Sequence, residues 1–251
     1  PPSFPAVTLL IAAHNEELFI AQKLDNSLAL DYPRDRLQIL VAADGSDDQT
    51  PEIVRGYGEQ GVELSFIPKR SGKMAAINRA MPQARGDIVV FSDANNMYNP
   101  QAIRELVIPF TDPTVGAAIG AKLVTQDKSN LSASEGLYWK YESSINENET
   151  RLGCCTSAVG EILAIRRELF IPPPDKIIND DHYMVLDLIR RGYRAVYVPT
   201  ARSSESISAS ARDEIIRRSR MNVGHYQLMA QARKILSFRR PMVAWQIVSH
   251  K

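Results

Sequence analysis

The chain has 251 residues, of which 44% are apolar and 24% are charged, and its formal net charge is +1. This length allows one large α/β domain or two small ones, with the composition of a soluble globular protein. The small net charge argues against nucleic acid as a partner. Two adjacent cysteines, Cys154 and Cys155, make neither a disulfide framework nor a zinc site, so we interpret them as reduced thiols in a cytosolic setting.

No apolar run approaches 18 residues, so we expect no membrane-spanning helix and no signal peptide within this sequence. Its abrupt ends, at Pro1-Pro2 and at Ser249-His250-Lys251, suggest a piece cut from a longer protein. Positive charge gathers from residue 212 onward, where nine Lys or Arg face two acidic residues and give +7. Such a segment fits a phosphate ligand or an anionic membrane surface, and equally the solvated face of a helix.

The first half alternates short apolar runs with helical patterns. We expect strands at residues 7–13, 37–42, 62–67 and 87–91, and helices at residues 16–30, 46–57 and 73–81. Strands separated by helices build βαβ units, which predicts an α/β fold with a mostly parallel central sheet and helices on both faces.

The second half is less regular. The patterns indicate helices at residues 131–148, 180–190 and 210–235, the last of them basic, and strands at residues 157–165 and 194–198. No repeat and no long linker separates two units, so we expect a single domain over residues 1–251.

Polar clusters follow all four strands of the first half. They are His14-Asn15-Glu16-Glu17, Asp44-Gly45-Ser46-Asp47, Lys69-Arg70-Ser71-Gly72-Lys73 and Ser92-Asp93-Ala94-Asn95. The carboxyl ends of parallel strands meet at one rim of the sheet, where open α/β sheets bind their ligands. Their convergence predicts a site more strongly than any one cluster does.

Each cluster has a functional and a structural interpretation. Asp93 and Asn95 offer two oxygen ligands to Mg²⁺ or Mn²⁺, although Asp-x-Asn is also common in turns and helix caps. Asp44 could accept a hydrogen bond from a uracil or a ribose, or belong to a turn. The segment at residues 69–73 lacks the Walker pattern but could still bring cations and helix amides to a phosphate.

Two later segments carry charge suited to catalysis. Asp180 and Asp181 open a predicted helix, where its dipole favours acids; one of them could instead deprotonate a hydroxyl as a general base. Arg217 and Arg220, at positions i and i+3, share one helix face and could bind a diphosphate together.

In this order, the motifs resemble those of family 2 glycosyltransferases with the GT-A fold, and among these the membrane-associated polysaccharide synthases. The resemblance extends from Val7 to Lys251. It is carried by residues 11–17 (IAAHNEE), 44–50 (DGSDDQT), 72–78 (GKMAAIN), 91–95 (FSDAN), 160–167 (GEILAIRR), 180–199 and 217–221 (RRSRM).

The resemblance implies an inverting transfer of a sugar. A Mg²⁺ or Mn²⁺ ion would bind at Asp93 and Asn95, Asp181 would act as the base with Asp180 beside it, and Arg217 and Arg220 would hold the leaving diphosphate. It further implies donor contacts from Ala13, His14, Asn15, Glu16, Asp44, Lys73, Asn78 and Asp93, and acceptor-side positions for Gly160, Glu161 and Met221.

The resemblance also implies a UDP-sugar donor, a glycan or lipid-linked acceptor, and a place on the cytoplasmic side of the inner membrane beside membrane helices outside this sequence. Residues 1–98 would form the nucleotide-sugar half of a GT-A domain. Residues 99–251 would form the acceptor-side half, with a C-terminal helical part.

The sequence departs from the family pattern at Ala43, where an aspartate is usual, at Asn95, where a second acid is usual, and at Met221, where an aromatic residue helps processive enzymes. Two alternatives therefore stay open. One is a non-catalytic module that binds a sugar nucleotide. The other is a sugar nucleotidylyltransferase, although residues 14–17 are not the Gly-rich basic loop of that class.

Overall fold

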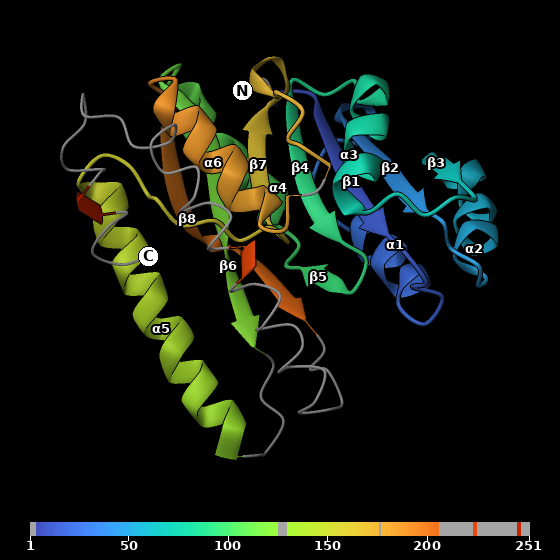
Figure 1. Ribbon diagram of the computed structural model, residues 1–251, viewed down its shortest axis with the longest axis horizontal. Helices are drawn as coiled ribbons and strands as arrows, with labels where there is room; N and C mark the ends of the chain where they lie inside the picture. The colour runs from blue at the N-terminus through green and yellow to red at the C-terminus, as the bar shows by residue number, and fades with distance from the viewer. Residues whose placement is uncertain (1–3, 125–129, 176, 206–222, 225–244, 247–251) are drawn as a thin grey trace.

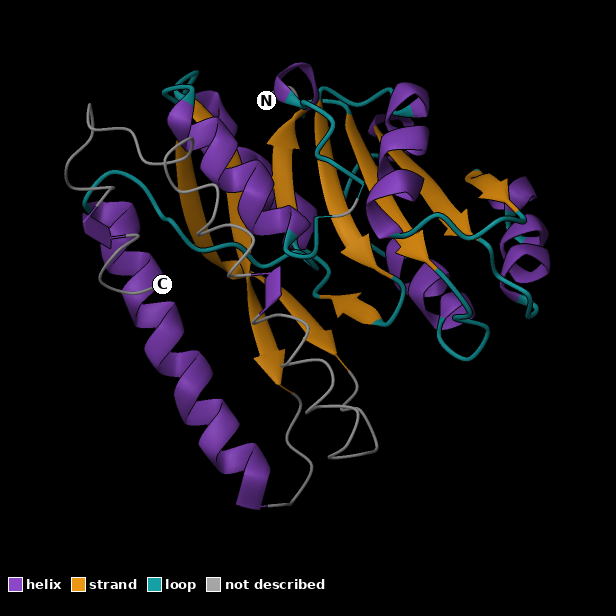
Figure 2. Cartoon of the chain, in the orientation of Figure 1, coloured by secondary structure: helices purple, strands orange, loops and turns teal. Residues whose placement is uncertain are grey.

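The computed structural model describes residues 4–124, 130–175, 177–205, 223–224 and 245–246. These residues form one curved eight-stranded sheet with helices packed on it (Figures 1 and 2), in the strand order β3-β2-β1-β4-β7-β6-β8-β5. The strands are β1 Val7–Ala13, β2 Leu37–Asp44, β3 Val62–Ile67, β4 Ile88–Asp93, β5 Asn96–Tyr98, β6 Val115–Val124, β7 Leu163–Arg166 and β8 Arg194–Glu205.

The first four strands are parallel to one another, as the βαβ pattern predicts. Beyond β4 the directions are mixed, because β7 is antiparallel to both β4 and β6, while β6 and β8 are parallel. The short β5 closes the far edge by antiparallel pairing with β8. The carboxyl ends of β1 to β4 therefore share one rim, and β5 follows directly after the end of β4.

Six helices lie within the described residues: α1 Ile20–Leu28, α2 Thr50–Gly56, α3 Lys73–Ala80, α4 Ala102–Val107, α5 Asn130–Arg151 and α6 Asp180–Arg190. Two apolar cores show which face each one covers. Leu9 of β1 packs with α1, α2 and α4, whereas its neighbour Leu10 packs with α3 and α6. Successive strand residues point to opposite faces, so an unbroken apolar run marks a sheet covered on both sides.

Several expected elements are confirmed, and the helix at residues 180–190 and the strands at 7–13 and 62–67 have the expected bounds. Two expected helices begin late, at Ile20 instead of 16 and at Thr50 instead of 46. The amides of residues 15–17 instead bond to side chains of residues 46, 48 and 50, which joins the two loops and keeps both out of the helices.

The expected strand at residues 157–165 is wrong in extent, since only Leu163–Arg166 is a strand, and the strand expected at 194–198 continues to Glu205. The strand β6 has no counterpart among the expected elements. Its Gly120 admits close packing, because a Cβ there would lie 2.7 Å from the carbonyl oxygen of Ala201. Of the helix expected at 210–235, only residues 223–224 are described, and both are helical.

Within the described part of the chain, no helix combines the length and the apolarity that crossing a bilayer requires.

Candidate active site

Hydrogen bonds from side chains join the loop after β1 to the loop after β2 at the rim. Asn15 and Asp47 bond reciprocally: the Asn15 amide donates to the Asp47 carboxylate at 2.6 Å, and the Asp47 N–H donates to the Asn15 carbonyl oxygen at 3.1 Å. A ring nitrogen of His14 lies 2.8 Å from the carbonyl oxygen of Asp44. Asn15 has a positive φ of 55°, which asparagine tolerates better than most residues. Two of the expected donor contacts, His14 and Asn15, thus also hold these loops together.

Asp44 organises the next loop from inside the protein. It is 3% exposed, and one of its carboxylate oxygens accepts the N–H groups of Ser71 and Gly72 at 2.7 and 2.6 Å. Arg79, which belongs to none of the expected site residues, pairs with the other oxygen at 3.3 Å. These bonds place the loop at residues 69–72 against β2. A contact between Asp44 and a nucleotide base stays a prediction.

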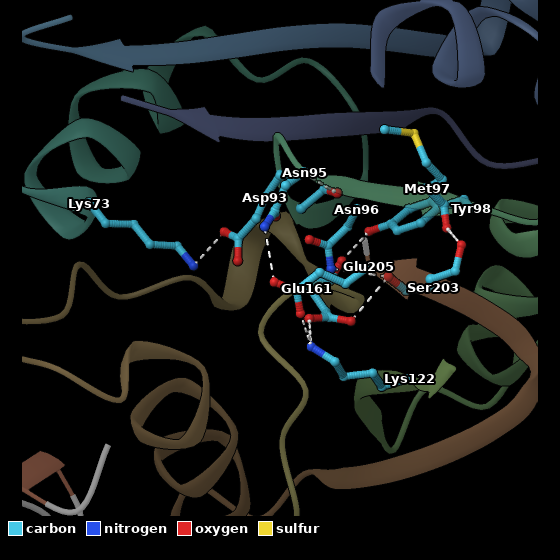
Figure 3. Close-up of polar contacts among 12 residues, drawn as sticks. Lys73, Asp93, Asn95, Asn96, Met97, Tyr98, Lys122, Glu161, Ser203 and Glu205 are labelled. Carbon is cyan, nitrogen blue, oxygen red and sulfur yellow. Dashed lines mark hydrogen bonds and ion pairs between the residues drawn. The ribbon is translucent and has the colours of Figure 1, made fainter. Parts of the chain in front are cut away.

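Lys73 joins two segments that are far apart in the sequence. It is the first residue of α3, and its ammonium lies 2.7 Å from the carboxylate of Asp93 at the end of β4 (Figure 3). The same ammonium lies 3.9 Å from the carboxylate of Asp180 at the start of α6. The Asp180 side chain is 12% exposed and that of Asp93 is 38% exposed. One cation therefore connects a buried acid with an acid that solvent and a ligand can reach.

Negative charge is crowded along this rim. Burial raises the pKa of Asp180 to about 6, with the carboxylates of Asp181 and Asp93 adding to the rise and Lys73 opposing it. Burial likewise raises the pKa of Glu16 to about 7, together with repulsion from nearby acids that include Asp93. Burial lowers the pKa of Lys73, but the carboxylates of Asp180 and Asp93 outweigh it and hold that pKa above its usual value. A site with this excess of carboxylates is suited to a cation.

Asp181 lies against a glycine. A Cβ at Gly160 would be 2.9 Å from a carboxylate oxygen of Asp181 and 3.0 Å from its Cβ, closer than side chains pack. Asp181 is partly exposed, whereas Asp180 is buried. Of the two acids, Asp181 is therefore the one that solvent and a substrate hydroxyl can reach.

Asn95 belongs to a second polar cluster, which reaches β6 and β8 (Figure 3). Its amide nitrogen donates to Glu205 at 3.0 Å. The ammonium of Lys122 contacts Glu205 and lies 2.8 Å from the carboxylate of Glu161. Ser203 donates to the other oxygen of Glu161 at 3.2 Å. Asn95 and Glu161 are among the expected site residues, but Lys122 and Glu205 are not, because no local pattern distinguishes them from solvated residues.

Beneath the turn after β4 lies a fully buried lysine, Lys23 of α1, with 0% exposure. Its ammonium donates to the carbonyl oxygen of Asn96 at 2.6 Å and lies 4.0 Å from the ring centroid of Tyr98. Burial lowers the pKa of Lys23 to about 7, against the pull of Asp93 and Glu161. A hydrogen bond from the buried Lys23 side chain thus holds the backbone just after the turn that carries Asp93 and Asn95.

The lowered pKa of Lys23 predicts a pH-dependent stability. In the unfolded chain a lysine keeps its proton to about pH 10.4, whereas folded Lys23 releases it near pH 7. Between these values the unfolded chain binds more protons, so Lys23 makes the free energy of unfolding rise with pH by at most about 1.4 kcal/mol per pH unit. In Lys23→Met this rise should be smaller. Urea unfolding of both proteins between pH 7 and 9 measures it, and parallel pH curves would contradict the assignment.

Asp93 and Asn95 fit one divalent cation that a ligand helps to bind. No group of three or more His, Cys, Asp or Glu residues within the described ranges is arranged to hold a metal ion by itself. The Asp93 carboxylate is partly exposed, and Asn95 turns its nitrogen toward Glu205, so its oxygen is the atom that can face a cation. Mg²⁺ commonly takes one or two protein oxygens and completes its shell with substrate phosphates and water.

The remaining expected site residues have other surroundings. Asn78 donates to the carbonyl oxygen of Pro173 and to the carboxylate of Asp175, both at 3.0 Å, and so ties α3 to the segment before α6. Ala13 is buried at the end of β1. Arg217, Arg220 and Met221 lie outside the described residues.

A family model described as glycosyl transferase family 2 matches residues 8–171. The chain belongs to this family. The probable glycosyltransferase YdaM of Bacillus subtilis is 27% identical over 219 residues, which cover 78% of this chain and 50% of the relative. Beta-monoglucosyldiacylglycerol synthase of Synechocystis is 33% identical over 132 residues, which cover 51% of this chain and 28% of the relative. This family 2 chain therefore spans half or less of the length of these relatives.

Solved structures agree with the family. The mannosyltransferase PcManGT from Pyrobaculum calidifontis, in complex with GDP-Man and Mn²⁺, is 28% identical with a TM-score of 0.78, over 92% of this chain and 65% of that one. Staphylococcus aureus TarS with UDP-GlcNAc is 15% identical with a TM-score of 0.63, over 81% of this chain and 59% of that one, and shows the fold alone. These matches confirm the expected GT-A fold for this member of family 2.

Proposed function

We propose that this chain is the catalytic domain of an inverting glycosyltransferase, which moves a sugar from a nucleoside-diphosphate donor to an acceptor hydroxyl. The observation that carries the proposal is the position of the Lys73 ammonium between Asp93 and Asp180. Through Lys73, Asp93, which is expected to face the donor, lies near Asp180 and its neighbour Asp181, which are expected to face the acceptor.

On the donor side, Asp93 and Asn95 would hold a Mg²⁺ or Mn²⁺ ion. Such an ion supplies Lewis-acid stabilisation of the negative charge that develops on a leaving diphosphate. Lys73 keeps the Asp93 carboxylate in place and adds a positive charge beside it. The loops held by Asn15 and Asp44 form the floor of this side. Arg217 and Arg220 are proposed to bind the diphosphate.

On the acceptor side, Asp181 is the proposed general base. It would accept the proton of the acceptor hydroxyl as that oxygen attacks the anomeric carbon from the face opposite the leaving group, which inverts the configuration. Asp180 is buried and lies beside the Lys73 ammonium, so an acceptor hydroxyl has less access to it than to Asp181. We assign Asp180 to fixing Lys73 instead.

The similarity to the synthase of Synechocystis, whose name specifies a glucosyl diacylglycerol, supports a glycan or lipid-linked acceptor. The poly-beta-1,6-N-acetyl-D-glucosamine synthase of Staphylococcus aureus, 27% identical over 202 residues, supports it as well. We further propose that the domain works at the cytoplasmic face of the inner membrane, with residues 1–98 binding the donor and residues 99–251 the acceptor side.

The donor base is the part of the proposal most open to direct test. The sequence favours a UDP-sugar, while PcManGT was solved with GDP-Man. Incubating the chain with UDP- and GDP-sugars, Mn²⁺ or Mg²⁺ and candidate acceptors should release a nucleoside diphosphate, and a chelator should stop the release. Release of pyrophosphate from a sugar phosphate and a nucleoside triphosphate would instead identify a nucleotidylyltransferase. A thermal shift without turnover for any donor would identify a binding module.

The contact between Gly160 and Asp181 predicts the effect of one added methyl group. Gly160→Ala should move the Asp181 carboxylate, because the new Cβ would overlap its oxygen. A displacement of about 1 Å in a catalytic group can cost roughly 100-fold in rate, whereas relieving this contact requires a shift of only a few tenths of an ångström. We therefore expect kcat, measured as nucleoside-diphosphate release, to fall by less than about 100-fold, with unchanged affinity for the donor.

The matched control is Gly58→Ala, since a Cβ at Gly58 would have no atom within 4 Å. This variant should keep the kcat of the parent protein. Equal losses in both variants, or a loss of donor affinity that accompanies the loss of kcat in Gly160→Ala, would show that Gly160 does not act through Asp181.

A further inference from the structure

A side chain from the last residue of β8 reaches the turn that follows β4. Glu205 pairs in antiparallel register with Asn96 of β5, the residue next to Asn95. Through this pairing the Glu205 carboxylate lies 3.0 Å from the amide nitrogen of Asn95 (Figure 3). Sheet pairing sets the backbone on both sides of the contact, so the orientation of the Asn95 amide is determined by β8 and not by its own loop.

The carboxylate of Glu205 is itself fixed. Its second oxygen contacts the ammonium of Lys122, which also bonds Glu161 at 2.8 Å. The side chains of these three residues are between 10% and 17% exposed. The carboxylates of Glu161 and Glu205 raise the pKa of Lys122 despite its burial, so the lysine stays charged. Because Lys122 holds one oxygen of Glu205, the other oxygen stays directed at the amide of Asn95.

We propose that Glu205 is a positioning residue of the cation site. Its carboxylate requires a side chain at position 95 that can donate a hydrogen bond, which asparagine can do and aspartate cannot. Because Glu205 binds the amide nitrogen, the amide oxygen of Asn95 is the atom left to bind the cation proposed at Asp93. The role of the cation in this inference rests on the proposed function, whereas the hydrogen bond between Asn95 and Glu205 does not depend on it. The missing second acid of the family motif is therefore no loss of function: its place is taken by an amide whose oxygen Glu205 orients.

The pairing has a consequence opposite to the one that the family motif suggests. Asn95→Asp restores the second acid, yet an aspartate has no N–H to donate to Glu205. Two carboxylates would then face each other at the 3.0 Å separation of the present bond. Glu205 already shares Lys122 with Glu161, so the new charge meets an acidic neighbourhood. Unpaired charges in such surroundings are strongly unfavourable.

A double-mutant cycle tests this directly. The variants are Asn95→Asp, Glu205→Gln and the double variant, in which the new amide at position 205 can donate to the new carboxylate at position 95 and so reverses the hydrogen bond. Gln60→Glu, an exposed change before β3 at the opposite rim, controls for the added charge. Two quantities are measured on the whole chain: the Kd of Mn²⁺ in the presence of saturating UDP or GDP, by the electron paramagnetic resonance signal of free Mn²⁺, and Tm without ligand.

We expect Asn95→Asp to weaken Mn²⁺ binding by about tenfold and to lower Tm by about 2 to 4 °C. The double variant should regain most of both losses. Tighter or unchanged Mn²⁺ binding in Asn95→Asp, or losses that simply add in the double variant, would overturn the inference. If the parent protein binds no Mn²⁺ with either nucleotide, the proposed cation site fails, and the Tm cycle alone still decides whether Glu205 and Asn95 are coupled.

Discussion

Asp181→Asn should abolish sugar transfer and leave donor binding intact. Asparagine keeps the shape of the side chain beside Gly160 but cannot accept the proton of an acceptor hydroxyl. Loss of a general base lowers rates by about 10² to 10⁴. We expect kcat for nucleoside-diphosphate release to fall within this range, with the Kd of the donor and Mn²⁺ unchanged.

Asp187→Asn on the same helix is the matched control. Asp187 pairs with Arg190 at the end of α6 and with Arg191 just after it, so the change removes a carboxylate of the same helix without touching the rim. Its kcat should equal that of the parent protein. Undiminished turnover in Asp181→Asn would mean that another group takes the proton, and Asp180 would be the next residue to replace.

Lys73→Met should impair both donor binding and turnover. The change removes the ammonium between Asp93 and Asp180 and leaves the two acids uncompensated. Removing one partner of a charge pair leaves the other charge unpaired, and this cost falls mainly on Asp180, whose side chain is 12% exposed. We expect a fall of about 100-fold in kcat/KM, with part of it in the donor Kd because Asp93 is no longer held in place.

The same variant should show a changed pH dependence of stability. Lys73 opposes the rise in the pKa of Asp180, which is about 6 in the parent protein, so without Lys73 that pKa should rise further. An acid whose folded pKa exceeds its unfolded value favours folding at low pH, and this contribution is lost as pH rises through the folded pKa. Lys73→Met should therefore lose more stability than the parent protein between pH 4 and pH 8.

Urea unfolding at several pH values measures this difference. Arg36→Met, an exposed cation just before β2 at the opposite rim, provides the control and should follow the parent protein in both stability and kcat/KM. If Lys73→Met unfolds with the pH profile of the parent protein, the ion pair with Asp180 is not formed in solution. The central role of Lys73 on the rim would then be wrong.

The parallel half of the sheet and the polar residues that meet at its rim could largely be predicted from the sequence. Strands β1, β2 and β4 are mostly apolar runs, and β3 alternates apolar and polar residues. The polar residues that end these strands meet through contacts such as Asn15 with Asp47 and Lys73 with Asp93. The prediction succeeded because strands and their ends depend on neighbours within a few residues, and because parallel strands must end at the same rim.

The second half of the sheet was harder to predict. The strand β6 contains Gly116 and Gly120 and several alanines, which dilute the few β-branched residues that would identify a strand. Its glycines are needed because other segments approach closely: a Cβ at Gly116 would lie 2.8 Å from the Cβ of Tyr193. Packing between distant segments decided this strand, and such packing leaves no periodic signal.

The sequence by itself determined the family, the parallel half of the sheet and the residues that carry charge at its rim. The tertiary structure alone decided which of these charges act on one another. The residues around Lys23 in the sequence suggest an ordinary surface lysine, yet Lys23 is fully buried and its ammonium bonds to β5. Asn95 meets Glu205 because β8 pairs with β5. The reason is physical: local patterns record only whether a residue faces water, whereas a charge pair depends on strand order, which brings together residues that are distant in the chain.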